Sequence, residues 1–169
     1  MLFEKYLVPD LVLPSFRQIT PALLQEHGIR YILSDIDNTL VTYDDAEPTP
    51  DVIAFFQMLA NAGVQIGFLS NNHADRVDRF NQSLHYVAIA DAGKPGIQVA
   101  KEALTKMGAD PRQTMFLGDQ LLTDAACAKR LGLFTVIVPP IKDRTDLFNR
   151  CKRLIEKPYM RKVTKRRKK

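Results

Sequence analysis

The chain has 169 residues, of which 46% are hydrophobic and 25% are charged, as is typical of one globular domain with a hydrophobic core. No apolar run is long enough to span a bilayer, so the sequence argues against a transmembrane helix. The apolar N-terminal segment has no cationic residues before it and is interrupted by Asp10, which argues against a cleaved signal peptide. Residues 152–169 hold ten Lys/Arg and one acid, whereas residues 1–151 hold 14 Lys/Arg and 18 Asp/Glu, so we expect a mildly acidic body with a basic arm.

Short apolar runs alternate with helical patterns along the chain. The runs are nearly continuous, as in parallel strands that are buried on both faces, and most of the helical patterns end at a glycine. This alternation predicts an α/β fold, a Rossmann-like three-layer sandwich with a mainly parallel sheet. In chain order we expect a strand at 31–33, a helix at 51–62, a strand at 64–69, a helix at 75–83, a strand at 86–90, a helix at 95–107, a strand at 114–117, a helix at 123–131 and a strand at 134–138.

Two aspartates follow the first predicted strand directly. Asp35 and Asp37 are separated by one residue, and side chains at i and i+2 leave an extended chain on the same side, so both carboxylates can face one ligand. In an open α/β sheet, ligands bind outside the carboxyl ends of the strands, which is where this pair stands. The two carboxylates of such a pair can take different roles, one as nucleophile or metal ligand and the other as general acid and base.

Three later strands are also followed by polar groups. Ser70 and Asn71 offer a hydroxyl and main-chain N–H groups, Lys94 offers an ammonium just before a predicted helix, and Asp119 and Asp124 lie in a turn that leads into another helix. Carboxylate oxygens are ligands for Mg²⁺, whereas an ammonium and N–H donors bind phosphate oxygens. The four strand ends therefore predict a site for Mg²⁺ and a phosphoryl group.

Four short motifs stand at these strand ends, in the order DIDNT (35–39), LSNN (69–72), GKP (93–95) and GDQLLTD (118–124). In this order the set resembles the four motifs of haloacid dehalogenase-like phosphatases, and the resemblance extends from residue 31 to residue 138. It implies a Mg²⁺-dependent hydrolase of phosphate monoesters that works through an aspartyl-phosphate. Asp35 would be the nucleophile and a metal ligand. Asp37 would be the general acid and base, with its main-chain carbonyl on the metal.

The resemblance also implies roles for the other matched positions. Ser70 and Asn71 would bind the phosphoryl oxygens. Lys94 would neutralise charge between the nucleophile and the phosphate and so take part in catalysis. Asp119 would ligate Mg²⁺, and Asp124 would ligate it or support it from behind.

The spacing between the motifs leaves little room for a cap domain. Residues 40–69 accommodate a loop, one helix and one strand, and residues 73–93 accommodate a short helix and a strand, so we expect a capless core with an open site. An open site excludes water poorly around a small metabolite and suits a substrate that is attached to something large. The chain resembles subfamily IIIA of this family and its YqeG-like branch in its compact spacing, its DIDNTL motif and its segment LVPDLVLPSF (7–16). That branch is similar to phosphatidylglycerophosphate phosphatases. That resemblance implies a lipid phosphate monoester, converted to phosphatidylglycerol.

The two ends of the chain bear on the partner of the enzyme. We predict a single domain over residues 1–156, whose apolar segment 1–28 packs on the core or lies in a membrane interface. The basic tail 157–169 is drawn either to an anionic membrane surface or to RNA or the ribosome. Two unpaired cysteines indicate reduced thiols, so we expect a cytoplasmic protein, with peripheral binding at the inner face of the membrane as an option.

Two alternatives to the lipid phosphatase stay open at this point. One is a phosphatase that acts on a soluble or nucleic-acid-linked phosphate. The other, from a different class, is an RNA- or ribosome-binding protein with a vestigial site. The presence of every catalytic position argues against the vestigial site.

Overall fold

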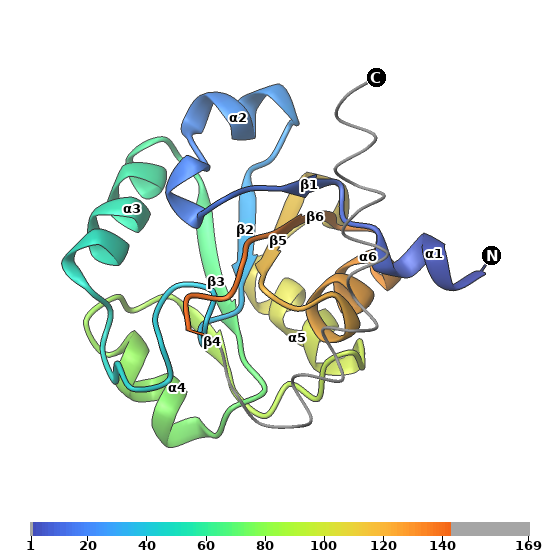
Figure 1. Ribbon diagram of the computed structural model, residues 1–169. Coiled ribbons are helices and arrows are strands. Elements are labelled where there is room, and N and C mark those ends of the chain that lie inside the picture. Colours follow the sequence, from blue (N-terminus) through green and yellow to red (C-terminus); the bar gives the residue numbers. More distant parts are fainter. Residues whose placement is uncertain (1, 143–169) are drawn as a thin grey trace.

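A computed structural model describes residues 2–142 of the chain, with side chains from residue 5 onward. Six parallel strands form one sheet in the order β1-β6-β5-β2-β3-β4, and helices lie on both sides of it (Figure 1). The predicted α/β class and Rossmann-like layering are confirmed, and the sheet is parallel throughout. The strands are β1 (Leu11–Val12), β2 (Tyr31–Ser34), β3 (Gln65–Leu69), β4 (Val87–Ile89), β5 (Thr114–Gly118) and β6 (Phe134–Ile137).

The five strands that the sequence predicts are all present, within one residue at each end, and β1 is an addition. The helices that follow the third and fourth motifs depart most from expectation. The α-helices are α1 (Leu2–Leu7), α2 (Pro21–Glu26), α3 (Pro50–Asn61), α4 (Ala74–Asn81), α5 (Gln98–Met107) and α6 (Ala126–Arg130). Short 3-10 turns lie at η1 (Phe16–Gln18) and η2 (Pro111–Gln113), and η3 (Leu121–Ala125) is a π-helical turn.

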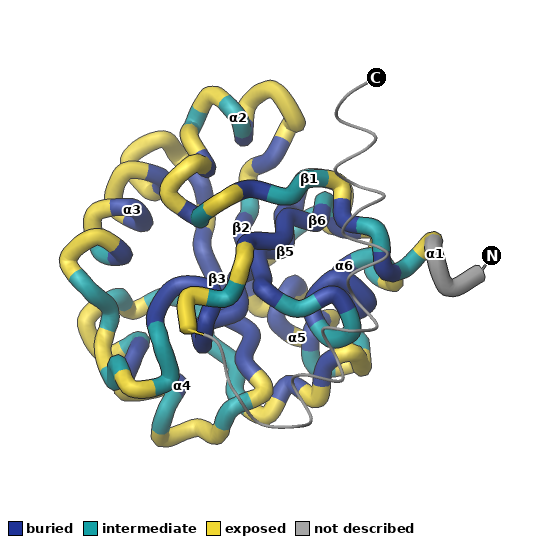
Figure 2. Tube along the Cα trace, viewed as in Figure 1, coloured by how far each residue is buried: buried dark blue, intermediate teal, exposed yellow. Residues whose placement is uncertain are grey.

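Alternation along the strands builds two core layers. In β2, Ile32 packs with residues of α2, α3 and α4, whereas its neighbour Leu33 packs with residues of α5 and α6. Met115 and Phe116 divide in the same way in β5. Successive side chains of a strand point to opposite faces, so continuous apolar strands require helices on both sides. Figure 2 shows the buried strands enclosed by exposed helix surfaces.

Helix α5 begins later than the sequence predicts. The sequence predicts a start at Pro95, whereas the helix starts at Gln98. Gly93 adopts a φ of +61°, and the N–H of Gly96 donates to the carbonyl of Gly93 at 2.8 Å, so a tight turn occupies this stretch. The turn delivers Lys94 to the end of the sheet before the helix starts.

The N-terminal segment packs on the sheet. β1 pairs with β6, and the side chains of Leu7, Leu13 and Phe16 are buried. These apolar residues therefore serve the core, which was one of the two roles predicted for residues 1–28. The extent of the single domain over 1–156 stays a prediction, and the basic tail lies outside the described residues.

The described chain inserts no cap domain next to the motifs. Between β2 and β3 it holds a loop and α3, and between β3 and β4 it holds α4. Within residues 2–142, none of the helices has the length and apolar character that crossing a bilayer would need.

Candidate active site

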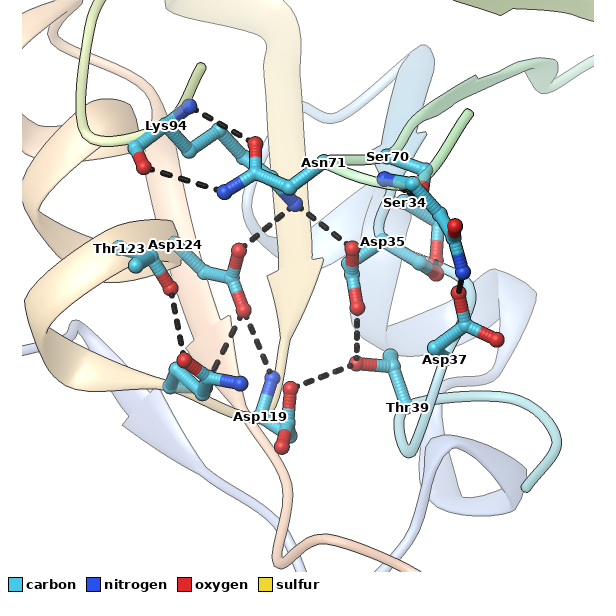
Figure 3. A network of polar contacts seen from close by, with 12 residues as sticks. Ser34, Asp35, Asp37, Thr39, Ser70, Asn71, Lys94, Asp119, Thr123 and Asp124 are labelled. Carbon is cyan, nitrogen blue, oxygen red and sulfur yellow. Dashed lines mark hydrogen bonds and ion pairs between the residues drawn. The ribbon is translucent and has the colours of Figure 1, made fainter. Parts of the chain in front are cut away.

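The segments that follow β2, β3, β4 and β5 bring the predicted site residues together. Each parallel strand ends at the same edge of the sheet, so motifs that are far apart in sequence become neighbours there (Figure 3). Most of these residues are unusually enclosed for polar groups, with 9% exposure or less, whereas Asn71 is exposed. The buried polar residues at this edge are Asp35, Asp37, Asn38, Thr39, Ser70, Lys94, Asp119 and Asp124.

Lys94 lies at the centre of the cluster. Its ammonium is 2.6 Å from Asp35 Oδ1 and 2.8 Å from Asp124 Oδ1, and its side chain is 2% exposed. The Asn71 carboxamide fixes the main chain of Lys94, because Nδ2 donates to the Lys94 carbonyl at 3.1 Å and Oδ1 accepts from the Lys94 N–H at 2.8 Å. The side chain of Asn71 therefore positions Lys94. The predicted contact of Asn71 with phosphoryl oxygens would have to come from its main-chain N–H, and it stays a prediction.

Three carboxylates converge beside the lysine. Asp35, Asp119 and Asp124 each offer an oxygen within 4.8 Å of the others. The Thr39 hydroxyl lies 3.2 Å from Asp35 Oδ2 and 3.4 Å from Asp119 Oδ1. Asp124 Oδ2 accepts from the main-chain N–H groups of Asp119 and Gln120 at 3.2 and 3.1 Å, so Asp124 is held rigidly behind the other two.

Asp37 is buried at the same edge but turns away from the triad. Its Oδ1 accepts from Arg76 Nη2 at 2.8 Å, and its Oδ2 accepts from Asn72 Nδ2 at 3.2 Å. The carboxylate of Asp37 is thus separate from the three that converge. The predicted metal contact of Asp37 would come from its main-chain carbonyl, and it stays a prediction.

Ser70 is 2% exposed and lies at the end of β3. Its Oγ accepts from the N–H of Asn72 at 3.0 Å, which tightens the loop that follows the strand. The hydroxyl hydrogen is left to donate elsewhere, because this bond uses only an acceptor lone pair. The geometry is compatible with the predicted phosphate contact and does not test it.

A model of one protein family matches residues 3–132, and its description is haloacid dehalogenase-like hydrolase. The chain belongs to this family. The resemblance read from the four motifs is thereby confirmed.

Two curated proteins extend the comparison. The chain is 31% identical over 156 residues to the "Probable phosphatase YqeG" of Bacillus subtilis, a match that covers 92% of this chain and 91% of that protein. It is 28% identical over 111 residues to the "Glyceraldehyde 3-phosphate phosphatase" of Methanopyrus kandleri, which covers 57% of this chain and 48% of that protein. The chain is accordingly a phosphatase of the haloacid dehalogenase type, and the YqeG-like resemblance is confirmed.

Solved structures share the fold at low sequence identity. An uncharacterized protein from Listeria monocytogenes matches with a TM-score of 0.55 at 16% identity, over 70% of this chain and 86% of that chain. CbbY from Rhodobacter sphaeroides, solved in complex with phosphate, matches with a TM-score of 0.53 at 15% identity, over 71% of this chain and 90% of that chain. These matches support the haloacid dehalogenase-like fold.

Burial and charge perturb the centre of this phosphatase in opposite ways. Burial raises the pKa of Asp35 to about 7, although the ammonium of Lys94 partly offsets the effect. Burial by itself would lower the pKa of Lys94, but Asp124 and Asp35 outweigh it and raise the pKa above the usual value. Lys94 is therefore a permanent cation at neutral pH, whereas the Asp35 carboxylate is the group in this pair that takes up a proton.

The donor set fits a hard divalent cation. Asp35, Asp119 and Asp124 supply carboxylate oxygens close enough to converge on one ion, and no thiol or imidazole is among the ligands of this cluster. Mg²⁺ prefers such oxygens and is held by one or two carboxylates together with phosphate and water. The family and the acidic triad together imply a divalent metal, of which Mg²⁺ is the typical one.

Sequence reasoning missed Arg76 and the hydrogen bond from Asn72 to Asp37. Arg76 lies in the first turn of α4, where the positive end of the helix dipole disfavours a cation. A basic residue at that position, four residues after the LSNN motif, was a signal that a carboxylate partner lies nearby. Asn38 was also missed, with a φ of +63° and a carbonyl that accepts from the N–H of Ile141 at 3.0 Å.

Replacing Gly118 by alanine should damage the site. A Cβ at this position would lie 2.5 Å from Cβ and Oδ2 of Asp124, which is fixed by its own hydrogen bonds and cannot withdraw. We expect Gly118→Ala to lose about 1–3 kcal/mol of unfolding free energy and at least about tenfold in kcat/KM. Chemical denaturation and steady-state kinetics measure both effects.

Gly67→Ala is the matched control for this substitution. A Cβ there would lie 2.5 Å from Sδ of Met107, the far end of a flexible side chain that can move aside, and 3.3 Å from the carbonyl oxygen of Val87, which needs to shift only slightly. Gly67→Ala should therefore keep its kcat. Equal losses of activity in both variants would contradict the account of Gly118.

Metal affinity should depend on pH through Asp35. The folded-state pKa of about 7 exceeds the usual aspartate value of 3.8, so ionisation of Asp35 opposes folding. The stability that the protein gains from keeping Asp35 protonated is fully present below about pH 4 and is lost as the pH rises through about 7. A metal competes with the proton, so below pH 7 the apparent affinity for Mg²⁺ should fall by up to about tenfold per pH unit.

Calorimetric Mg²⁺ titrations at pH 5.5, 6.5, 7.5 and 8.5 measure this dependence. Affinity should change little between the two highest values and fall between the two lowest. An affinity that is constant across the series would contradict the raised pKa of Asp35.

Proposed function

We propose that the protein hydrolyses phosphate monoesters through an aspartyl-phosphate on Asp35. The observation that carries the proposal is the position of the Lys94 ammonium, 2.6 Å from Asp35 and 2.8 Å from Asp124 in a buried site. A carboxylate cannot approach a phosphate dianion unless cations offset the repulsion, and a buried lysine supplies a fixed one.

The chemistry divides into two displacements. Asp35 attacks the phosphorus atom, the bond from phosphorus to the leaving oxygen breaks, and Asp37 gives that oxygen a proton. A water molecule then gives its proton to Asp37 and attacks the phosphorus, which releases inorganic phosphate and restores the Asp35 carboxylate. The two steps leave Asp37 in its original state, so one residue serves as acid and then as base.

The other residues position and neutralise the phosphoryl group. Ser70 and the main-chain N–H of Asn71 hold two of its oxygens, and Lys94 holds a third. Asp35, Asp119, the main-chain carbonyl of Asp37 and, directly or from behind, Asp124 would hold Mg²⁺, which would neutralise phosphoryl charge there. Most of the catalysis in this scheme is positioning and charge stabilisation, as is general for phosphoryl transfer.

We further propose that the substrate is a lipid phosphate monoester, with phosphatidylglycerophosphate as the first candidate. The absence of a cap within the described residues supports a substrate that is carried on a large body. The motif resemblance to phosphatidylglycerophosphate phosphatases supports the same substrate. The apolar N-terminus contributes less, because Leu7, Leu13 and Phe16 are buried in the core, and the basic tail 157–169 is left as the anionic-membrane contact.

Phosphate release from three substrates tests both levels of the proposal. The substrates are phosphatidylglycerophosphate in mixed micelles, soluble glyceraldehyde 3-phosphate and p-nitrophenyl phosphate, each with and without Mg²⁺. A lipid phosphatase should prefer the micellar substrate. A chain shortened to residues 1–156 should lose that preference while it keeps turnover of the aryl phosphate.

Other outcomes select among the alternatives. Preference for glyceraldehyde 3-phosphate would favour the soluble-phosphate function that the Methanopyrus kandleri relative bears in its name. Absence of turnover on all three substrates with Mg²⁺ would favour the vestigial site and an RNA- or ribosome-binding role.

A further inference from the structure

Arg76 connects three parts of the site edge. Its Nη2 donates to Asp37 Oδ1 at 2.8 Å, and its Nη1 donates to the carbonyl of Ala46 at 2.9 Å. The side chain is 15% exposed and that of Asp37 is 7% exposed, so the ion pair is largely removed from solvent. One residue of α4 therefore holds both the carboxylate of Asp37 and the loop that follows the first motif.

Two features of Arg76 lower the stability of the folded state. Among the residues that the structure describes, its Nε is the only buried side-chain polar atom without a hydrogen-bond partner. It also places a cation in the first turn of α4, at the positive end of the helix dipole. A buried unsatisfied donor and an unfavourable helix position both oppose folding, so the contacts of Arg76 with Asp37 and Ala46 must offset them.

The contacts assign different tasks to the two oxygens of Asp37. A guanidinium only donates hydrogen bonds, so Oδ1 must act as an acceptor while Arg76 is bound to it. When Asp37 is protonated, the proton is therefore directed to Oδ2. That oxygen has only the longer 3.2 Å contact with Asn72, which is released more easily.

We propose that Arg76 is the positioning residue for the acid of the reaction, and that it holds Asp37 so that Oδ2 carries and delivers the proton. This inference rests on the proposed function, in which Asp37 protonates the leaving oxygen. Arg76 acts only through Asp37 and contacts no reacting atom. Its anchor on Ala46 fixes the guanidinium, which in turn stops rotation of the carboxylate.

The dependence of rate on the leaving group tests the inference. A poor leaving group such as a simple alkoxide needs a well-placed proton, whereas p-nitrophenolate departs with little assistance. In Arg76→Met, kcat/KM should fall by about 10–100-fold for an alkyl phosphate and by less than about threefold for p-nitrophenyl phosphate, since general acid catalysis contributes about 10²–10⁴-fold in all. Phenyl phosphate should fall between the two.

Three further variants separate positioning from structure. Arg79→Met is the matched control, because Arg79 lies on the same helix with a 63% exposed side chain, and it should leave all three rates unchanged. Arg76→Lys keeps a cation but loses the planar fork whose two nitrogens bind Asp37 and Ala46, so it should restore part of the alkyl phosphate rate. In an Asp37→Asn background, adding Arg76→Met should cause no further loss.

The outcomes separate the inference from the function on which it rests. An equal loss for all leaving groups in Arg76→Met and Arg76→Lys, or an additional loss in the Asp37→Asn background, would overturn the positioning role. If wild-type protein with Mg²⁺ hydrolyses none of the three phosphates, the proposed function fails and the inference falls with it. A steeper leaving-group dependence that Arg76→Lys partly reverses would support the inference, and Arg76→Lys also serves if Arg76→Met does not fold.

Discussion

Asp35→Asn should abolish turnover of every phosphate monoester that the wild type hydrolyses. The amide has the shape of the carboxylate but is a very poor nucleophile, so it cannot carry out the proposed attack on the phosphorus atom. We expect kcat to fall by at least about 10³-fold, as is common when a covalent nucleophile is removed. Phosphate release with Mg²⁺ at pH 8, where the Asp35 carboxylate with a pKa of about 7 is ionised, measures the effect.

The fold should survive this substitution. The carboxamide introduced by Asp35→Asn would still accept a hydrogen bond from Lys94, and an uncharged side chain avoids the burial penalty that raises the pKa of the aspartate. Asp78→Asn, at an exposed position of α4, is the control for the same chemical change. Retention of more than a tenth of the wild-type kcat in the Asp35 variant would show that another group attacks the phosphorus.

Lys94→Met should damage stability and activity together. Methionine fills the same space but leaves the carboxylates of Asp35 and Asp124 facing each other without a cation between them. Removing one partner of a buried ion pair typically costs about 3–5 kcal/mol. Losing a fixed cation at the phosphoryl group should lower kcat/KM by a further factor of about 10² or more.

Added Mg²⁺ should restore part of the lost stability, because the ion can take over the neutralisation of the acidic triad. The stability control is Lys142→Met. The ammonium of Lys142 lies at the same 2.6 Å from Asp44, but both side chains are about two-thirds exposed, so water screens the pair and it should contribute little to stability. A loss in Lys94→Met no larger than in the control, measured by chemical denaturation without Mg²⁺, would contradict the structural role of Lys94.

The sequence predicts the sheet well because its signals are local. The runs that became β2, β3 and β5 are apolar and end in polar motifs, so both their identity and the edge at which they place ligands are readable without coordinates. The same reading brings Asp35, Lys94, Asp119 and Asp124 to one place, since parallel strands share a carboxyl edge.

Features that depend on distant contacts were not predictable. β1 has only two residues, and its pairing with β6 depends on the completed sheet. The turn that delays α5 depends on the positive φ of Gly93, which a Gly-Lys-Pro sequence permits but does not require. The ion pair between Asp37 and Arg76 spans 39 residues, and no periodicity along the chain reports it.

The order of the strands has a consequence for how the protein is made. Of the six described strands, β1 is synthesised before the others, and its sole partner in the described sheet is β6, where Leu11 lies opposite Val136. The central strand β2 can pair early with β3, but its pairing with β5, with Tyr31 opposite Thr114, must wait for residues further along the chain. Contacts of such wide sequence separation close slowly, so the carboxylates of the candidate site should assemble only after most of the domain has been synthesised, when Lys94 is already present to neutralise them.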